Sequence, residues 1–239
     1  MINNLKIKIF SDGADLEEIK DMNSKDFIQG ITTNPTLMRA SDVTDYEDFA
    51  KEVLKFVNKK PLSLEVFDDD LDIMFKQAKV ISSWGENVYV KLPIYNTKKE
   101  FIGPVAEKLS KIGIKLNITA VMTEQQVEET LKYLNKDVES IISVFAGRIA
   151  DTGRDPLDTM NKCLEIMKNN QKSELLWASP RETLNIYQAD KIGCHIITVT
   201  SGLIKKLSLY HKNLDDYSVE TAKMFYDDAL KSNFKINCE

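Results

Sequence analysis

The sequence predicts an α/β fold, a (β/α)8 TIM barrel with an additional C-terminal helix. Two observations favour it: apolar, β-branched runs alternate with amphipathic stretches along the chain, and eight such runs fit within its 239 residues. Eight strands alternating with helices in roughly 200–250 residues favour a closed barrel over an open doubly wound sheet. No G-x-G-x-x-G or P-loop stretch follows the first run, so a nucleotide-binding sheet loses its main support.

The predicted strands are short runs, most of which end at a polar residue. They span Leu5–Asp12, Gly30–Asn34, Leu62–Phe67, Val88–Lys91, Lys115–Val121, Ser140–Phe145, Glu174–Ser179 and Cys194–Thr200. Between them, apolar residues recur at helical spacing, for example at Phe49, Val53, Leu54 and Val57, at Leu71, Met74, Phe75 and Ala78, and at Leu157, Met160, Leu164 and Met167.

Local signals predict where several helices begin. Capping boxes at Thr44 with Glu47 and at Thr123 with Gln126 predict two helix starts, and Asp15 is expected to cap the first helix. The segment Asp216–Leu230 predicts the additional helix, which could fold back over one mouth of the barrel. No linker or low-complexity stretch interrupts the pattern, so residues 1–239 are expected to form a single domain.

Composition excludes several classes of partner. The net charge of -5 and the pI near 5.3 argue against binding to nucleic acid or to an anionic membrane. No run reaches transmembrane length, and Met1–Phe10 alternates like a strand instead of resembling a signal peptide. The chain contains 3 cysteines without metal-ligand spacing and only 2 histidines. We therefore expect a cytoplasmic protein without a histidine-rich metal site.

Side-chain alternation assigns the polar strand residues to the barrel interior. In Leu62–Val66 the three apolar residues must face the helices, so Glu65 points inward. Further residues are expected at the carboxyl-terminal mouth, where barrel active sites lie, either because they alternate in the same way or because they end a strand. They are Asp12, Thr32, Asn34, Lys91, Asn117, Thr119, Ser143 and Phe145. Polar residues that converge from several strands predict a binding site.

Lys91 is the plausible covalent nucleophile in this set. An amine must be neutral to attack a carbonyl, whereas a free lysine titrates near pKa ~10.4, and burial can lower that value. The resulting protonated imine is an electron sink that makes an adjacent carbon–carbon bond breakable. Asp12 or Glu65 could accept and return the proton.

Each residue also has a structural interpretation. Lys91 could be a solvated residue at the rim, Asn34 could serve a turn, and Arg148 could pair on the surface with Asp151 or Asp155. Ser179 and Arg181 could be ordinary loop residues, and His195 is expected to be a packed strand residue instead of a catalyst. For each residue taken alone, the structural role is the better interpretation. For all of them together it would require many coincidences of position, so a shared functional site is favoured.

In collinear order, the chain resembles the transaldolase family. The segments that carry the resemblance are Phe10–Asp15, Gly30–Thr36, Glu65–Val66, Val90–Pro93, Leu116–Thr119, Ser143–Ile149 and Ala178–Arg181. Each is weakly specific, but the ordered set is strong. The resemblance implies a metal-free barrel enzyme that needs no cofactor and uses a lysine Schiff base to transfer a dihydroxyacetone unit. The implied donor is a ketose phosphate of the sedoheptulose 7-phosphate or fructose 6-phosphate type, and the acceptor is an aldose.

The resemblance also implies a role for each matched position. Lys91 would form the imine, Asp12 would take the proton from the hydroxyl beside the cleaved bond, and Glu65 with Thr119 would hold a water molecule. Four polar residues would line the sugar pocket, and three would bind the phosphate. They are Thr32, Asn34, Asn117 and Ser143 for the sugar, with Phe145 beside them, and Arg148, Ser179 and Arg181 for the phosphate.

Alternatives remain open within and outside this class. The fructose-6-phosphate aldolase subgroup has a tyrosine where this chain has Phe145 and a glutamine where it has Glu65, which favours transfer over cleavage. Tyr95 and Pro180 depart from the family pattern, so a specialised transaldolase for an unusual sugar is a second hypothesis. A non-catalytic sugar-phosphate-binding protein is a third. The resemblance further implies a homo-oligomer assembled through terminal helices, with Val219, Ala222, Met224, Phe225 and Ala229 as candidate contacts.

Overall fold

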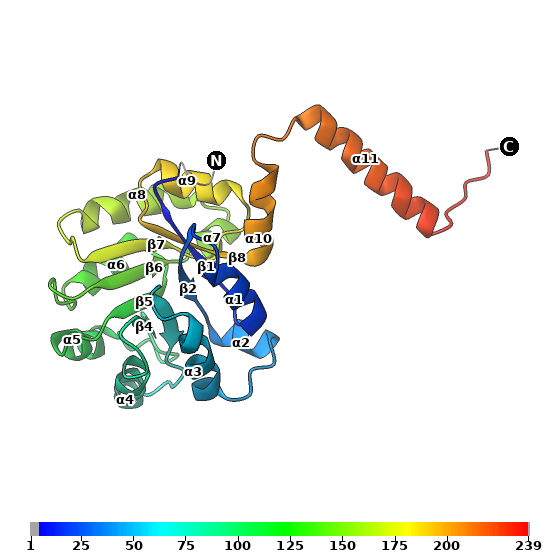
Figure 1. Ribbon diagram of the computed structural model, residues 1–239. Helices are drawn as coiled ribbons and strands as arrows, with labels where there is room; N and C mark the ends of the chain where they lie inside the picture. Colours follow the sequence, from blue (N-terminus) through cyan, green and yellow to red (C-terminus); the bar gives the residue numbers. More distant parts are fainter. Residues whose placement is uncertain (1–4, 239) are drawn as a thin grey trace. The chain divides into compact units, whose positions relative to one another are not determined.

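The computed structural model describes residues 5–238 and shows eight parallel strands closed into a barrel (Figure 1). Every predicted strand run overlaps one of them, which confirms the predicted fold class. Residues 1–4 of the segment Met1–Phe10 lie outside the described part of the chain. The strands are β1 (Lys8–Asp12), β2 (Ile28–Thr32), β3 (Leu62–Glu65), β4 (Val88–Pro93), β5 (Leu116–Val121), β6 (Ser140–Val144), β7 (Ser173–Trp177) and β8 (Ile196–Thr200).

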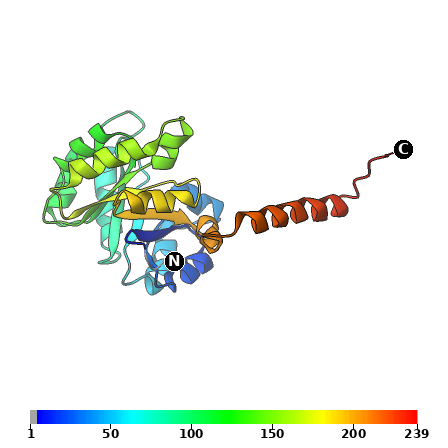
Figure 2. The same cartoon turned by 90° about the horizontal axis from the view of Figure 1, so that it is seen from above.

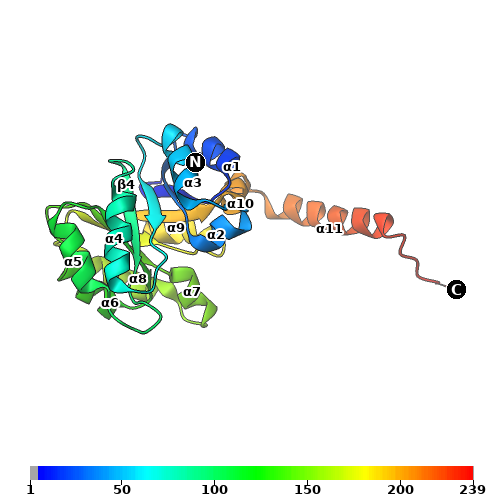
Figure 3. The same cartoon turned by 90° about the horizontal axis from the view of Figure 1, so that it is seen from below.

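Helices follow the strands and lie outside the barrel, as Figures 2 and 3 show from two further directions. Up to Lys205 they are α1 (Leu16–Asn23), α2 (Pro35–Ala40), α3 (Tyr46–Phe56), α4 (Leu71–Ser82), α5 (Gly103–Lys111), α6 (Glu124–Leu131), α7 (Ala146–Asp151), α8 (Pro156–Met167), α9 (Leu184–Lys191) and α10 (Ser201–Lys205). Their apolar stripes pack on the outward faces of the strands, where Leu62, Leu64 and Val90 are fully buried.

Two of the three predicted helix caps are confirmed. Asp15 accepts a hydrogen bond from the Glu18 backbone N–H, and Thr123 with Gln126 forms the complete capping box at α6. The capping box at Thr44 is wrong by one residue. Asp45 caps α3 instead, because its carboxylate accepts from the backbone N–H of Asp48 at 2.8 Å.

A layer of large side chains fills the barrel beneath its carboxyl-terminal mouth. Phe10, Tyr89, Ile141 and Ile196 belong to one buried cluster. Each precedes by two residues a polar residue on the same strand, so alternation directs both inward, one above the other. Gly30 leaves the room that the Phe10 ring needs, since a Cβ there would lie 2.5 Å from the ring. The polar residues lie directly above this apolar layer, which we call the floor of the site.

The described residues fall into two compact units, one up to Lys205 and one from Lys206 onward. The first contains the barrel, and the second contains a short 3-10 helix, η2 (Lys206–Leu209), and α11 (Leu214–Lys231). The predicted C-terminal helix is thereby confirmed, whereas a single domain over residues 1–239 stays a prediction. No helix between residues 5 and 238 combines the length and apolar character needed to cross a bilayer.

Candidate active site

A cavity of about 500 Å³ opens at the carboxyl-terminal ends of the strands. All of the site residues expected from the sequence line it, although they come from seven different strand ends or the loops that follow. They are Asp12, Thr32, Asn34, Glu65, Lys91, Asn117, Thr119, Ser143, Phe145, Arg148, Ser179 and Arg181. The structure therefore brings the whole predicted constellation to one site.

Lys91 is buried, with 6% of its surface exposed, and its amine lies between two oxygen atoms. The Nζ atom lies 3.0 Å from Glu65 Oε2 and donates a hydrogen bond to the Thr33 carbonyl oxygen at 2.7 Å. Residues Glu65 and Lys91 are direct neighbours in the β3–β4 register, which sets this contact. The interpretation of Lys91 as a solvated rim residue is therefore wrong, because the amine is inside the barrel.

Asp12 ends β1 and faces the same cavity. Its Oδ1 atom accepts a hydrogen bond from Thr32 Oγ1 at 2.7 Å, and the two residues are register partners on β1 and β2. Burial raises the pKa of Asp12, while the charge of Lys91 and the hydrogen bond from Thr32 oppose that shift. A carboxylate with a raised pKa is a stronger base than an ordinary aspartate, which suits it to accept and return a proton.

Glu65 is held from its backbone as well as through its side chain. The phenol of Tyr46, the first residue of α3, donates a hydrogen bond to the Glu65 carbonyl oxygen at 2.7 Å. The Tyr46 ring packs edge-on against Phe67 and near Trp84, with centroid distances of 5.3 and 5.9 Å. Burial raises the pKa of Tyr46, so its phenol stays protonated and can act as the donor.

Three polar residues of β5 and β6 line the wall beside Lys91. Ser143 Oγ donates to Asn117 Oδ1 at 2.7 Å, and Asn117 Nδ2 donates to Ser63 Oγ at 3.1 Å. Thr119 is only 2% exposed, and its hydroxyl has no hydrogen-bond partner within residues 5–238. A buried hydroxyl without a partner is costly, so this one is suited to bind a water molecule or a substrate hydroxyl.

Asn34 has both a structural contact, at the start of α2, and a position in the wall of the cavity. Its side-chain oxygen caps α2 by accepting from the Leu37 backbone N–H at 2.9 Å, so the structural interpretation holds. The residue also lines the cavity, and the capping bond involves the amide oxygen alone. The side-chain NH2 group can still donate to a ligand.

Two arginines lie at the other side of the cavity, after β6 and β7. Arg181 forms an exposed ion pair with Asp151 through Nε at 3.0 Å and through Nη2, and this pairing lowers the pKa of the Asp151 carboxyl. The guanidinium of Arg148 lies over the Phe145 ring, 5.8 Å from its centroid. Asp151 thus hydrogen-bonds Arg181 and not Arg148. Exposed ion pairs contribute little to stability, so an incoming anion can displace or share this one.

The backbone around this side of the cavity is tightly packed. Ser179 adopts a φ of 60°, a left-handed conformation that is uncommon for residues other than glycine. Its carbonyl oxygen lies where a Cβ on Gly147 would be, at 1.5 Å, so this position requires glycine. Ala120 has a φ of 59° at a break in the β5–β6 register and also lines the cavity. Unusual backbone geometry of this kind often occurs at functional sites.

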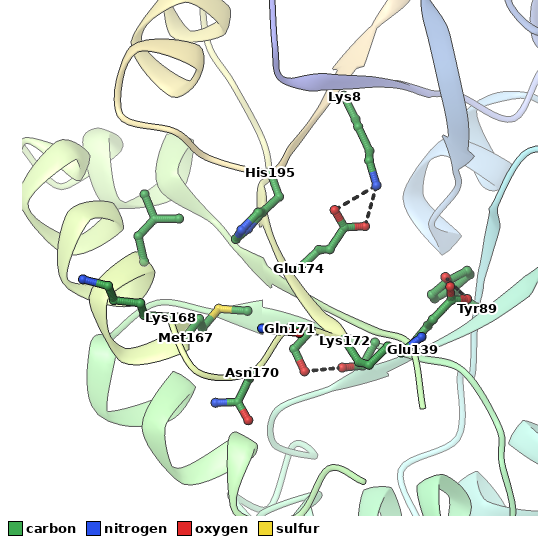
Figure 4. Close-up of a pocket in the computed structure, with 13 residues that line it drawn as sticks. Lys8, Tyr89, Glu139, Met167, Lys168, Asn170, Gln171, Lys172, Glu174 and His195 are labelled. Atoms are coloured by element: carbon green, nitrogen blue, oxygen red, sulfur yellow. Dashed lines mark hydrogen bonds and ion pairs between the residues drawn. The ribbon is translucent and has the colours of Figure 1, made fainter. Parts of the chain in front are cut away.

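A second and larger cavity, of about 610 Å³, lies at the amino-terminal ends of the strands (Figure 4). It contains none of the predicted site residues. Lys8 forms an ion pair with Glu174 at 2.9 Å, and His195 Nδ1 accepts from the Leu175 backbone N–H at 2.9 Å. His195 lies directly before β8 and is half-buried, so it is not the packed strand residue that was predicted, although its hydrogen bond to the backbone is a structural one. This end of a barrel usually contributes to stability, so the smaller cavity is the candidate active site in spite of its size.

Sequence reasoning missed several residues of the site. Thr198 lines the cavity and hydrogen-bonds Thr32, and side-chain alternation along β8 could have identified it. Tyr46, the Thr33 carbonyl and the pairing of Asp151 with Arg181 depend on contacts between distant segments. Nothing in the local sequence predicts those three. Among residues 5–238, no group of three or more His, Cys, Asp or Glu side chains is placed to hold a metal ion.

The fold and the cavity define a class: a parallel (β/α)8 barrel with a buried lysine next to a carboxylate at its carboxyl-terminal mouth. Comparison with known protein families identifies the family within this class. A family model described as transaldolase/fructose-6-phosphate aldolase matches residues 9–238, and the chain belongs to that family. It is accordingly an enzyme of the transaldolase or aldolase kind.

Named relatives agree with this assignment. A probable transaldolase of Nitrosopumilus maritimus is 34% identical over 203 residues, which cover 84% of this chain and 87% of the relative. One of a Thermoanaerobacter species is 30% identical over 231 residues, covering 96% of this chain and 100% of the relative. Among solved structures, an aldolase named QR15 is similar in fold, with a TM-score of 0.55 at 12% identity, covering 87% of this chain and 97% of that one.

Proposed function

We propose that the protein is a transaldolase that transfers a dihydroxyacetone unit from a ketose phosphate to an aldose through a Schiff base on Lys91. The observation that carries this proposal is the position of the Lys91 amine, buried and 3.0 Å from the Glu65 carboxylate, in a cavity that also contains Asp12. No metal or other cofactor takes part in the proposed reaction.

In the first stage the lysine amine attacks the ketone carbon of the donor sugar. Glu65 can take a proton from the ammonium group at 3.0 Å, which leaves the amine free to add to the carbonyl. Loss of water from the adduct then gives the protonated imine. Glu65, with the unpartnered hydroxyl of Thr119, is suited to hold the water molecule that leaves and later returns.

In the second stage the bond between the dihydroxyacetone unit and the rest of the sugar breaks. Asp12 takes the proton from the hydroxyl next to that bond, and the electron pair of the bond moves into the imine to give an enamine. The shortened aldose then leaves. An acceptor aldehyde takes its place, the enamine attacks it, and Asp12 returns the proton. Hydrolysis of the new imine frees Lys91 and the product.

Hydroxyl groups of the sugar would be held by Thr32, Asn34, Asn117 and Ser143. Asn117 is itself fixed by hydrogen bonds to Ser63 and Ser143, so it presents a rigid surface to the substrate. Rigid positioning of this kind lowers the entropic cost of reaching the reactive geometry.

The phosphate of the donor would be bound by Arg148, Ser179 and Arg181. We expect Arg181→Ala to raise KM for fructose 6-phosphate about 10-fold or more, because a charge-assisted, bidentate hydrogen bond is lost. The rate with unphosphorylated fructose should change little. Initial-rate measurements with both donors check this.

Arg154→Ala is the matched control for Arg181→Ala. Arg154 is exposed, hydrogen-bonds Thr152 at 2.8 Å and does not line the cavity. Its KM for the phosphorylated donor should stay at the wild-type value. An equal loss with both donors in Arg181→Ala would contradict a phosphate-binding role.

Transfer and simple cleavage differ in their need for an acceptor. In an assay in which a reductase consumes free dihydroxyacetone, a transaldolase gives little signal from fructose 6-phosphate alone. On addition of erythrose 4-phosphate it forms sedoheptulose 7-phosphate. Rapid release of dihydroxyacetone without any acceptor would identify an aldolase instead. Saturable binding without turnover in either assay would identify a non-catalytic binding protein.

Phe145 bears on the balance between transfer and cleavage. Its ring lines the cavity and has no hydroxyl with which to activate water. We expect Phe145→Tyr to raise the ratio of dihydroxyacetone release to transfer several-fold, since a phenol can promote hydrolysis of the intermediate. The ratio is measured by running both assays on the same preparation, with Phe101→Tyr as a control for a new phenol outside the cavity. An unchanged ratio would contradict this role.

We also propose that the chain forms a homo-oligomer. The helix α11 contains Val219, Met224 and Phe225, and none of its residues is buried. Apolar side chains on one helix are commonly covered by a partner. Light scattering on the purified protein should give a mass of at least twice the 27.3 kDa of one chain, and a mass of 27.3 kDa would contradict the proposal.

A further inference from the structure

Thr198, in the middle of β8, faces the cavity next to Thr32 and Asp12. It is 6% exposed, lines the cavity, and follows the floor residue Ile196 by two positions, so alternation directs its side chain inward at the level of the site. β8 is paired with β1, with Phe10 opposite Thr198 and Asp12 opposite Thr200. The pairing places Thr198 two residues before the end of β1, and its hydroxyl contacts Thr32 on β2.

Thr198, Thr32 and Asp12 form a chain of hydrogen bonds. Thr32 Oγ1 lies 2.7 Å from Asp12 Oδ1 and 2.5 Å from Thr198 Oγ1. A threonine hydroxyl has one hydrogen, and an ionised carboxylate can only accept. When Asp12 is ionised, the Thr32 hydrogen must therefore point at Asp12. Thr198 must then be the donor in its bond to Thr32, which fixes the direction of the whole chain.

We propose that Thr198 is a positioning residue, which donates to Thr32 and thereby holds the Thr32 hydroxyl toward Asp12 and favours the ionised, basic form of that carboxylate. The role in catalysis rests on the proposed function. When Asp12 gains a proton it becomes a donor, and the Thr32 hydrogen can turn to Thr198. The chain then reverses, but its bonds are weaker because none of its members carries a charge, so Thr198 supports the ionised form more than the protonated form. Asp12 can thus alternate between acceptor and donor, as cleavage and transfer both require.

Charged groups near Asp12 also affect its protonation, and their effect is separate from that of the uncharged hydrogen bonds of Thr32 and Thr198. Lys91 on β4 favours the ionised carboxylate, and Glu65 on β3 opposes it. On α1, Glu18 lies beside Gly13 and is bound by the hydroxyl of Ser201, which follows β8. Burial raises the pKa of Asp12, and the hydrogen bond from Thr32 lowers it. Thr198 adds no charge, so its effect reaches Asp12 through Thr32 alone.

The test is a direct titration of Asp12 in the full chain. Aspartate carboxyl carbons are labelled with carbon-13 and followed by NMR across pH, and the Asp12 signal is assigned by its loss in Asp12→Asn. In Thr198→Val we expect the Asp12 midpoint to rise by roughly 0.3–0.5 pH unit, because the midpoint reports only the part of one hydrogen bond's free energy by which the ionised state exceeds the protonated state. The acid side of the pH profile of kcat/KM should move the same way, because a higher pKa leaves less of the base form at low pH.

Three further variants test whether the shift of the Asp12 midpoint is due to the Thr198 hydroxyl acting through Thr32. Thr198→Ser keeps the hydroxyl and should restore the wild-type midpoint. Thr130→Val, which removes a buried hydroxyl that bonds the Gln126 carbonyl on α6, should leave it unchanged. In a Thr32→Val background, Thr198→Val should add no further shift, because the link is already broken. If Thr198→Val does not fold, Thr198→Ala removes the same donor.

An unchanged Asp12 midpoint in Thr198→Val, or an equal shift in the Thr32→Val background, would overturn the inference. The titration needs no substrate, so it decides the matter even if the enzyme acts on another sugar. A wild-type chain that forms no imine with fructose 6-phosphate would refute the proposed function instead. The two failures are therefore distinguishable.

Discussion

Replacing Lys91 by alanine should reduce transfer activity by about 10⁴-fold or more, because the nucleophile that forms the imine is lost. Lys91→Arg should be equally inactive. A guanidinium keeps the charge beside Glu65 but is not deprotonated in proteins and forms no imine. Initial rates with fructose 6-phosphate and erythrose 4-phosphate check both variants.

The matched control is Lys8→Ala. Lys8 lies in the cavity at the opposite end of the barrel and pairs with Glu174 (Figure 4). Its loss should leave kcat and KM near the wild-type values. Activity that survives in Lys91→Ala while circular dichroism shows a folded barrel would contradict the assignment of the nucleophile.

Asp12→Asn should lower kcat by about 10²–10⁴-fold, the usual contribution of a positioned general base. The amide can still accept the hydrogen bond from Thr32, so the geometry of the site is retained while the proton acceptor is removed. Formation of the imine on Lys91 should continue, since the carbonyl attack precedes the step that needs Asp12. Borohydride trapping combined with steady-state kinetics separates the two steps.

Asp15→Asn is the control for Asp12→Asn. Asp15 caps α1 through the Glu18 backbone N–H, and asparagine is an equally good capping residue. Activity and thermal stability should both stay unchanged. If Asp12→Asn blocked imine formation as completely as Lys91→Ala, Asp12 would have to act earlier than proposed.

The sequence was sufficient to predict the barrel and most of the site because both depend on alternation. Residues two apart on a strand share a face, so Glu65 had to point away from Leu64 and Val66 into the barrel. The parallel register then brings Glu65 beside Lys91 without any further information. The same rule, applied to β8, would have found Thr198.

Contacts made through loops and helices could not be predicted in this way. The Tyr46 phenol at the start of α3 reaches the Glu65 carbonyl at the end of β3, which depends on side-chain length and helix placement. Arg181 pairs with Asp151 because the loop after β7 passes α7, where Gly147 permits the close approach of Ser179. The cap at Asp45 was missed because Thr44 and Asp45 are adjacent and both suit the position.

The most direct test of the central claim is the trapping of the covalent intermediate. The protein is mixed with fructose 6-phosphate, reduced with borohydride and digested, and the modified residue is located by mass spectrometry. We expect one dihydroxyacetone-derived adduct, attached to Nζ of Lys91 and missing from Lys91→Ala. An adduct on another lysine, or an equal adduct in Lys91→Ala, would contradict the account.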